Sequence, residues 1–149
     1  MIFEEGPALI RSFVPEGSAF EILRSEANNE GYRFIETLNR RWQDGSDRYS
    51  LEGEALLAAF FEGELVAVGG LNRDPYVNDG TGRIRHVYVR KPWRKSSVGK
   101  QLVATLVTLA RRRFPSLRLR ASDEAASRFY DRIGFSRVSE DTATHRMPL

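Results

Sequence analysis

The stretch from Val89 to Leu102, VRKPWRKSSVGKQL, decides the fold because it joins a strand to a helix through a short basic loop. The residues before it, 83–89, have the composition of a β-strand. After the loop, apolar residues recur at helical spacing, namely Val98, Leu102, Val103, Leu106, Val107, Ala110 and Phe114. A small-residue loop that leads into a helix presents free backbone N–H groups and the positive end of the helix dipole. We therefore expect a phosphorylated ligand at the start of this helix.

The composition indicates one globular domain spanning residues 1–149. No apolar run is long enough to cross a bilayer, and the N-terminal residues lack the basic-then-apolar pattern of a signal peptide. The chain has no cysteine, which excludes disulfides, thiolate zinc sites and a cysteine nucleophile, and agrees with a reducing cytoplasm. With only His86 and His145 in the sequence, we also expect no metal site.

The net charge of +3 is small, but its cations are concentrated in the central stretch. They are Arg83, Arg85, Arg90, Lys91, Arg94, Lys95 and Lys100. A nucleic-acid-binding protein could use such a cluster. No groove-reading motif accompanies it, however, and the basic residues 111–113 late in the helix ordinarily complement the helix dipole. The charge pattern therefore disfavours nucleic acid as the partner and keeps it only as an alternative.

The N-terminal third of the chain predicts two helices. Ser18 and Glu21 have the spacing of a capping box at the start of the first helix. A second helical pattern covers residues 32–42, and Gly45 is a suitable C-terminal stop for it. A loop follows, and the periodicity then changes from helical to extended near residue 54.

The middle of the chain predicts an antiparallel hairpin followed by a loop. Two short apolar runs, 55–61 and 65–70, are separated by the turn sequence Glu-Gly-Glu. Residues 72–82 are rich in Asn, Asp, Gly and Pro, so they form a loop that leads into the central strand. Beyond the central helix, the alternation around residues 117–120 predicts a strand covered on one face.

The C-terminal part predicts one more helix and two strands. Ser122 or Asp123 caps the helix, and Gly134 ends it. Residues 135–138 and 145–149 are then the last strands. The order of elements indicates an α/β or α+β domain built on a mixed sheet.

A second segment, SDEAASRFYDRIGF from Ser122 to Phe135, completes a resemblance to the GNAT superfamily of N-acyltransferases. The central loop is similar to that family's pyrophosphate-binding pattern, with Arg94 in its first position and Gly99 in its last. Ser97 replaces the middle glycine, and Asp123 replaces the usual asparagine of the second motif. The resemblance covers residues 83–135, and the hairpin also matches. It implies a GNAT fold with a central mixed, mostly antiparallel sheet of six to seven strands and about four helices.

The resemblance further implies acetyl-CoA as the cofactor. Successive N–H groups from Lys95 to Lys100 could surround its pyrophosphate, and cationic side chains could add charge. Ser97 fits such a loop if its backbone is helical, whereas a positive φ there would cost about 1 kcal/mol. In the family the strand holding the pantetheine arm splays from its neighbour. The expected cofactor-binding residues are Val87, Tyr88, Val89, Arg94, Lys95, Ser96, Ser97, Val98, Gly99, Lys100, Asp123, Ala126 and Phe129. The alternative is a capped helix N-terminus with a solvated basic loop.

Tyr130 is the candidate general acid. In the family the matching tyrosine protonates the departing thiolate, and a phenol can donate a proton while un-ionised at neutral pH. The alternative is a core aromatic residue. For the general base, Arg83 stands where many relatives have a glutamate. Our candidates are His86, Asp74 and His145, with a water chain as a further possibility.

Together these features predict an acetyl-CoA-dependent N-acetyltransferase. It would act on a primary amine by direct attack in a ternary complex. A non-catalytic acyl-CoA-binding regulatory module is the main alternative, because the family glutamate is missing. The N-terminal helices and the loop 72–82 should select the acceptor, which the sequence leaves open among a polyamine, an amino acid, an aminoglycoside-like drug and a protein N-terminus. Membership of the family also makes a homodimer possible by analogy.

Overall fold

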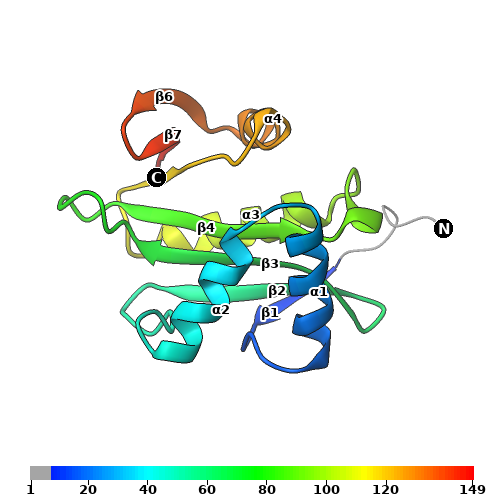
Figure 1. The fold of residues 1–149 in the computed structure, drawn as a ribbon. Helices are drawn as coiled ribbons and strands as arrows, with labels where there is room; N and C mark the ends of the chain where they lie inside the picture. Colours follow the sequence, from blue (N-terminus) through cyan, green and yellow to red (C-terminus); the bar gives the residue numbers. More distant parts are fainter. Residues whose placement is uncertain (1–7) are drawn as a thin grey trace.

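The computed structural model describes residues 8–149, and these form a seven-stranded sheet with the strand order β1-β2-β3-β4-β5-β7-β6 (Figure 1). All neighbouring pairs are antiparallel except β4 and β5. The predicted mixed, mostly antiparallel sheet is therefore confirmed. Its strands are β1 (Leu9–Ser12), β2 (Ala55–Phe61), β3 (Glu64–Arg73), β4 (Gly82–Val89), β5 (Ser116–Leu119), β6 (Ser136–Glu140) and β7 (Ala143–Pro148).

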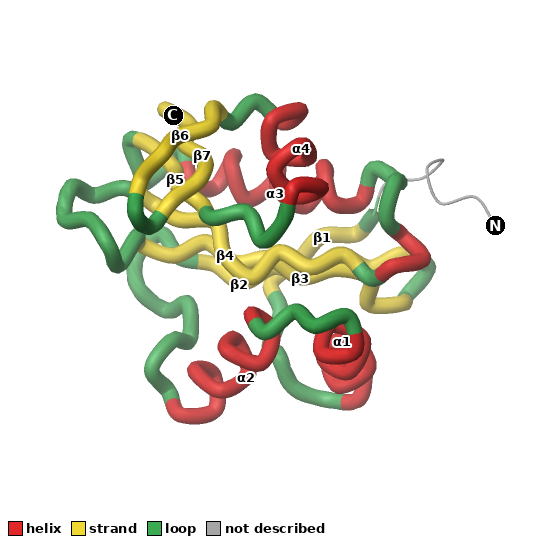
Figure 2. The backbone as a smooth tube through the Cα atoms, turned by 45° about the horizontal axis from the view of Figure 1, so that its top comes forward, coloured by secondary structure: helices red, strands yellow, loops and turns green. Residues whose placement is uncertain are grey.

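Four α-helices cover the sheet, two on each face (Figure 2). On one face lie α1 (Ser18–Asn29) and α2 (Phe34–Asp44), and on the other lie α3 (Val98–Ala110) and α4 (Glu124–Ile133). A short 3-10 helix, η1 (Lys91–Trp93), connects β4 to the basic loop. The sheet separates two apolar cores, one under α1 and α2 and a larger one around α3. No helix within residues 8–149 has the length and apolar character needed to cross a membrane.

The turns that the sequence marked are formed as predicted. Glu62 and Gly63 both have positive φ, 51° and 83°, which is the backbone of a two-residue hairpin turn between β2 and β3. Gly45 and Gly134 end α2 and α4 in left-handed conformations, with φ of 78° and 118°. Asp123 is the N-cap of α4, and its side chain accepts a hydrogen bond from the Ala126 N–H.

Two local predictions were wrong and one strand was missed. Ser18 is the first residue of α1, whose N-cap is Gly17, so the capping box does not form. Glu21 pairs with Arg24 one turn along the helix instead. Strand β5 is buried at all four residues, because the Arg118 side chain is held inside by carboxylates. The missed element is β1, whose four residues are too few to show a period.

Candidate active site

The site lies where β4 and β5 separate. These two parallel strands are paired only at Gly82↔Leu117 and Arg83↔Arg118. From Ile84 onward β4 has no β5 partner, so the peptide groups on that edge are available to a ligand. The splay that the resemblance implied is therefore present, and it opens a wedge through the sheet.

Two adjoining cavities occupy this wedge, with volumes of about 330 and 320 Å³. We call the first the β4 cavity, because residues 83–87 form one wall, and the second the loop cavity, because the basic loop borders it. Five residues line both cavities: Phe34, Val87, Ser122, Ala126 and Tyr130. A molecule in the loop cavity and a molecule in the β4 cavity would therefore meet at Tyr130.

The basic loop has the geometry of a phosphate site. The residue with positive φ is Lys95, at 66°, whereas Ser97 has φ −82° and ψ 0°. Ser97 is therefore unstrained, and its replacement of the family glycine carries no backbone penalty. The N–H groups of Gly99 and Lys100 donate to no residue in the described chain, since the first helical bond runs from Gln101 N to Ser97 O. These free donors lie at the positive end of α3.

Most predicted cofactor residues border the loop cavity, and three do not. Those that line it are Val87, Tyr88, Val89, Arg94, Lys95, Ser96, Gly99, Asp123, Ala126 and Phe129. Ser97 accepts a hydrogen bond from the Gln101 amide, Val98 is in the core, and Lys100 is exposed. Gly99 is needed for close packing, because a Cβ there would lie 3.2 Å from a Val89 methyl and 3.4 Å from the Phe129 ring.

Arg94 is held in place by a carboxylate that the sequence did not reveal. Its guanidinium donates to both oxygens of Glu30, at 2.7 and 2.6 Å, and its Nε donates to the Val89 carbonyl at 2.8 Å. The Tyr88 hydroxyl donates to the same Glu30 carboxylate. Hydrogen bonding to Arg94 lowers the pKa of Glu30, and that carboxylate raises the pKa of Arg94. Each of the three guanidinium nitrogens of Arg94 thus donates one hydrogen bond to a protein atom.

A second contact crosses the loop cavity from the α1–α2 connection to α4. The Tyr32 hydroxyl donates to Asp123 Oδ2 at 3.0 Å. Because Asp123 also caps α4, this bond ties the two walls together. Tyr32 was missed as a site residue because its place in a helical pattern suggested only packing.

Tyr130 lies on α4 between the two cavities with its ring in contact with the core. It is 7% exposed, and its ring packs edge-on against Phe129 and Phe135. Its hydroxyl makes no hydrogen bond with any residue among 8–149. Burial raises the pKa of Tyr130, so the phenol stays protonated at neutral pH. It is an available proton donor at the junction of the cavities.

His86 sits in a bulge of β4 that faces the β4 cavity. His86 and Val87 lie opposite the single β3 residue Gly69, and His86 takes a left-handed φ of 60°. Such a conformation in a non-glycine strand residue persists only where its surroundings enforce it. The bulge therefore directs the His86 ring into the cavity wall instead of leaving it in a regular strand position.

Tyr49 fixes the His86 ring from the other side. The Tyr49 hydroxyl and His86 Nδ1 are 2.6 Å apart, and Tyr49 also has a positive φ, 54°. Gly70 makes room for it, because a Cβ at that position would lie 2.6 Å from the tyrosine ring. Burial, assisted by the nearby charge of Arg85, lowers the pKa of His86 to about 3, so the ring is neutral at physiological pH.

Asp74 lies in a buried ion-pair cluster at the closed end of the wedge. Its Oδ2 accepts a hydrogen bond from Arg83 at 3.2 Å and lies 3.6 Å from Arg118, and its Oδ1 accepts the Tyr76 N–H. Arg83 also donates to the Thr142 carbonyl. This cluster joins β4, β5 and the C-terminal hairpin. The arrangement favours Asp74 as a counter-ion to two arginines over Asp74 as a proton acceptor.

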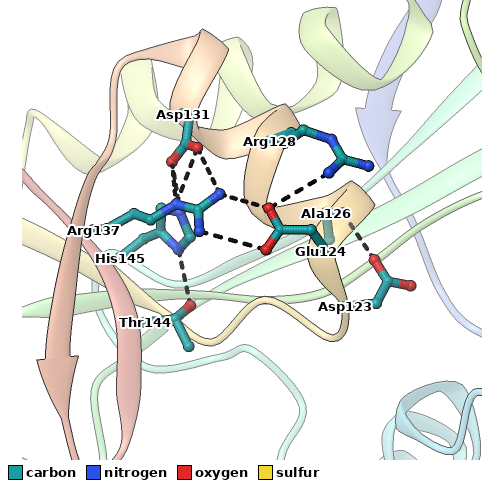
Figure 3. A network of polar contacts seen from close by, with 8 residues as sticks. All are labelled: Asp123, Glu124, Ala126, Arg128, Asp131, Arg137, Thr144 and His145. Atoms are coloured by element: carbon teal, nitrogen blue, oxygen red, sulfur yellow. Dashed lines mark hydrogen bonds and ion pairs between the residues drawn. The ribbon is translucent and has the colours of Figure 1, made fainter.

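His145 belongs to a separate polar network beside α4 (Figure 3). Its ring nitrogens contact Thr144 Oγ1 at 2.8 Å and Asp131 Oδ1 at 2.9 Å, and it is fully buried. Asp131 also pairs with Arg137. The network connects α4 to β6 and β7, and His145 borders neither cavity.

Comparison with known proteins gives one family. The sequence profile of the Acetyltransferase (GNAT) family matches residues 19–135. No curated protein matches this chain in sequence. Among solved structures, a candidate acetyltransferase from Exiguobacterium sp. 255-15 is 28% identical, with a TM-score of 0.84 over 96% of this chain and 94% of that one.

Two more distant structures share the fold. The PaiA N-acetyltransferase of Thermoplasma acidophilum, solved with coenzyme A, is 13% identical with a TM-score of 0.73, over 97% of this chain and 100% of that one. The ribosomal-protein-alanine N-acetyltransferase of Brucella melitensis is 17% identical with a TM-score of 0.69, over 95% and 99%. At these identities the likeness concerns the fold alone.

Proposed function

Because this chain belongs to the GNAT acetyltransferase family, we propose that it transfers the acetyl group of acetyl-CoA to a primary amine by direct attack in a ternary complex. One observation carries the proposal: the loop cavity and the β4 cavity meet at the unpaired hydroxyl of Tyr130. Two substrates bound in these cavities would be adjacent, as a direct transfer requires.

The loop cavity fits acetyl-CoA as the acyl donor. The free N–H groups at the start of α3 suit its pyrophosphate, and the unpaired edge of β4 suits the amide groups of its pantetheine arm. Phe129 and Ala126 supply apolar lining beside them. When bound, acetyl-CoA supplies a thioester that an amine can attack. The family's cofactor is therefore consistent with the chemistry of the residues present.

Tyr130 is proposed as the general acid. Its hydroxyl is protonated, partly shielded from water and free of competing hydrogen bonds. It can donate that proton to a leaving thiolate in the loop cavity. A backbone N–H on the free edge of β4, at Val87 or Val89, would stabilise the negative charge that develops on the attacked carbonyl.

His86 is proposed as the proton acceptor for the attacking amine. The ring is neutral and lines the β4 cavity. If Nδ1–H donates to the Tyr49 oxygen, Nε2 is left with a lone pair toward the cavity. A pKa near 3 makes the ring a weak base, so we expect proton loss from the amine to limit turnover below neutral pH. Asp74 is not used, because both of its oxygens accept bonds from protein groups.

The test is calorimetric titration with acetyl-CoA and with S-acetylpantetheine, which has the thioester but no phosphate, followed by thiol release with a panel of amines. We expect saturable acetyl-CoA binding that weakens by about tenfold or more without the phosphates. Lys100→Ala should weaken acetyl-CoA binding, whereas Arg112→Ala, an exposed cation at the other end of α3, should not. Binding without turnover of any amine would support the regulatory-module alternative. No binding at millimolar concentration would refute the proposal.

A further inference from the structure

Among the residues that the structure describes, four arginines and no carboxylate line the β4 cavity. Among its lining residues are Arg41 from α2, Arg83 and Arg85 from β4, and Arg120 after β5. No Asp or Glu is among them. The four cations come from three parts of the sequence, and the fold brings them to one cavity. Such an excess of one charge around a small cavity selects the charge of what binds there.

These arginines differ in whether the protein neutralises them. Arg83 pairs with buried Asp74 and donates to the Thr142 carbonyl, so its charge is compensated. Within residues 8–149, the side chains of Arg41 and Arg85 form no ion pair and no hydrogen bond. Arg120 donates only to a neutral carbonyl, that of Asp141. The cavity therefore holds three cations without a carboxylate partner.

Carboxylates do exist nearby, but they serve other groups. Arg41 and Arg85 also border a neighbouring hollow whose lining includes Asp47 and Glu54. Asp47 accepts hydrogen bonds from Asn72 and the Tyr49 N–H, and Glu54 accepts from Asn72 and a backbone N–H. The two arginines are left half-buried between the hollows without a counter-ion.

The arginines of the loop cavity are arranged differently, because Arg94 has a carboxylate partner and only the exposed Arg132 has none within residues 8–149. Around the loop cavity, Arg94 is bound by Glu30 through two hydrogen bonds, and Arg90 nearby is bound by Glu26 and Glu64. Burial is the main cause of the lowered pKa of Arg83 and of His86, and the charge of Arg85 lowers both pKa values further. Unpaired arginines at a cavity wall match carboxylate or phosphate oxygens, which accept two parallel hydrogen bonds from one guanidinium.

We propose that the acceptor is a small amine that also carries a carboxylate or phosphate group, held by Arg41 and Arg85 while its amino group faces His86. The proposal rests on the proposed function. It excludes polyamines, whose charges the same arginines would repel. A volume of about 330 Å³ suits a molecule of amino-acid size.

The test has a binding arm and a turnover arm, each run on wild type, Arg85→Gln, Arg41→Gln and Arg40→Gln. Arg40 is the matched control, because it is an exposed arginine on the same helix that does not border the cavity. The ligands are aspartate, phosphoethanolamine, their neutral analogues asparagine and ethanolamine, and spermidine. Calorimetry without acetyl-CoA measures binding, and thiol release measures kcat and KM.

We expect aspartate or phosphoethanolamine to bind more tightly than its neutral analogue, and Arg85→Gln to weaken that binding by about tenfold. The KM should rise by a similar factor with little change in kcat, and Arg40→Gln should leave both unchanged. Which anionic amine binds distinguishes a carboxylate from a phosphate. Arg85→Glu should increase the affinity for spermidine relative to that for aspartate.

Three results would overturn the proposal. One is binding of spermidine or a neutral amine above both anionic amines. Another is an equal loss of affinity for the anionic amine in Arg85→Gln and Arg40→Gln. The third is that neither anionic amine binds at all. Failure of the proposed function itself appears separately, as loss of acetyl-CoA binding or of all thiol release.

Discussion

The loop cavity and the β4 cavity are two parts of one wedge, yet they differ in how their arginines are paired with carboxylates. Around the loop cavity Arg94 is bound by Glu30, only the exposed Arg132 has no carboxylate partner among residues 8–149, and free backbone N–H groups lie at the start of α3. Around the β4 cavity Arg41 and Arg85 have no carboxylate partner in the described part of the chain. The first side can be recognised locally in sequence, because a loop before a helix carries it. The second arises from residues 44 positions apart that only the fold unites.

Tyr130 is the proposed proton donor among the five residues that line both cavities, so changing it should have the largest effect. Tyr130→Phe should reduce kcat by about a hundredfold or more, because only the proton donor is lost. Acetyl-CoA affinity should stay within about twofold, since the ring and its packing remain. Stopped-flow thiol release with parallel calorimetry measures both. Unchanged turnover would remove Tyr130 from the mechanism.

Burial of His86 beside the β4 cavity should make the free energy of unfolding depend on pH. The pKa of His86 is about 3 in the folded chain and 6.5 when unfolded. As pH falls through this window the unfolded state takes up the proton first. The free energy of unfolding should therefore decrease by up to about 1.4 kcal/mol per pH unit. In His86→Asn, where asparagine also tolerates a positive φ, the free energy of unfolding measured with denaturant should depend less steeply on pH.

Tyr49→Phe is the control for that experiment, because it removes the hydrogen bond to His86 and leaves the ring buried. Its slope with pH should resemble that of wild type. Identical slopes for wild type and His86→Asn would mean that His86 is hydrated and titrates normally.

On the paired side, Glu30 competes with any phosphate for Arg94. Glu30→Gln should tighten acetyl-CoA binding by about fivefold, equivalent to about 1 kcal/mol for a partly exposed ion pair. Calorimetry at low and high salt checks this, because the gain should shrink as salt rises. Weaker binding in the variant would show that Glu30 instead holds Arg94 in its binding position.

The smallest effect is expected at Ser97. Its φ of −82° needs no glycine, so Ser97→Gly should change acetyl-CoA affinity by less than about twofold. Lys95→Gly relieves a positive φ instead, and we expect it to raise the free energy of unfolding modestly, by about 0.5 kcal/mol. A large affinity gain in Ser97→Gly, measured by the same titration, would contradict the geometry.

The fold was predictable because its signals are local. The Glu62-Gly63 turn, the stop at Gly45 and the cap at Asp123 are each fixed by a few neighbouring residues. The capping box at Ser18 did not form because Ser18 is the first residue of α1 and Gly17 takes the N-cap position. Strand β1 was not predicted because its four residues are too few to show an alternation of apolar and polar side chains.

The site was predictable mainly on its loop side, and on the β4 side His86 was one of several candidates. The motif identified the basic loop and Tyr130 by spacing, but it left the backbone of Ser97 open and did not indicate that Lys95 is the loop residue with positive φ. The bulge at His86 requires a left-handed non-glycine residue, which strand propensity does not indicate. Arg94 and Glu30 are 64 positions apart, so no local sequence pattern indicates that they pair.

The two-pair contact between β4 and β5 has a mechanical consequence. Strands β1 to β4 form one block and β5 to β7 another, joined in the sheet only at Gly82 and Arg83. Any molecule lodged between the blocks acts as a brace that replaces the absent interstrand bonds. Ligand binding should then make the second block more rigid. Backbone amides of β5, β6 and β7 should exchange their hydrogens more slowly even where no ligand atom contacts them.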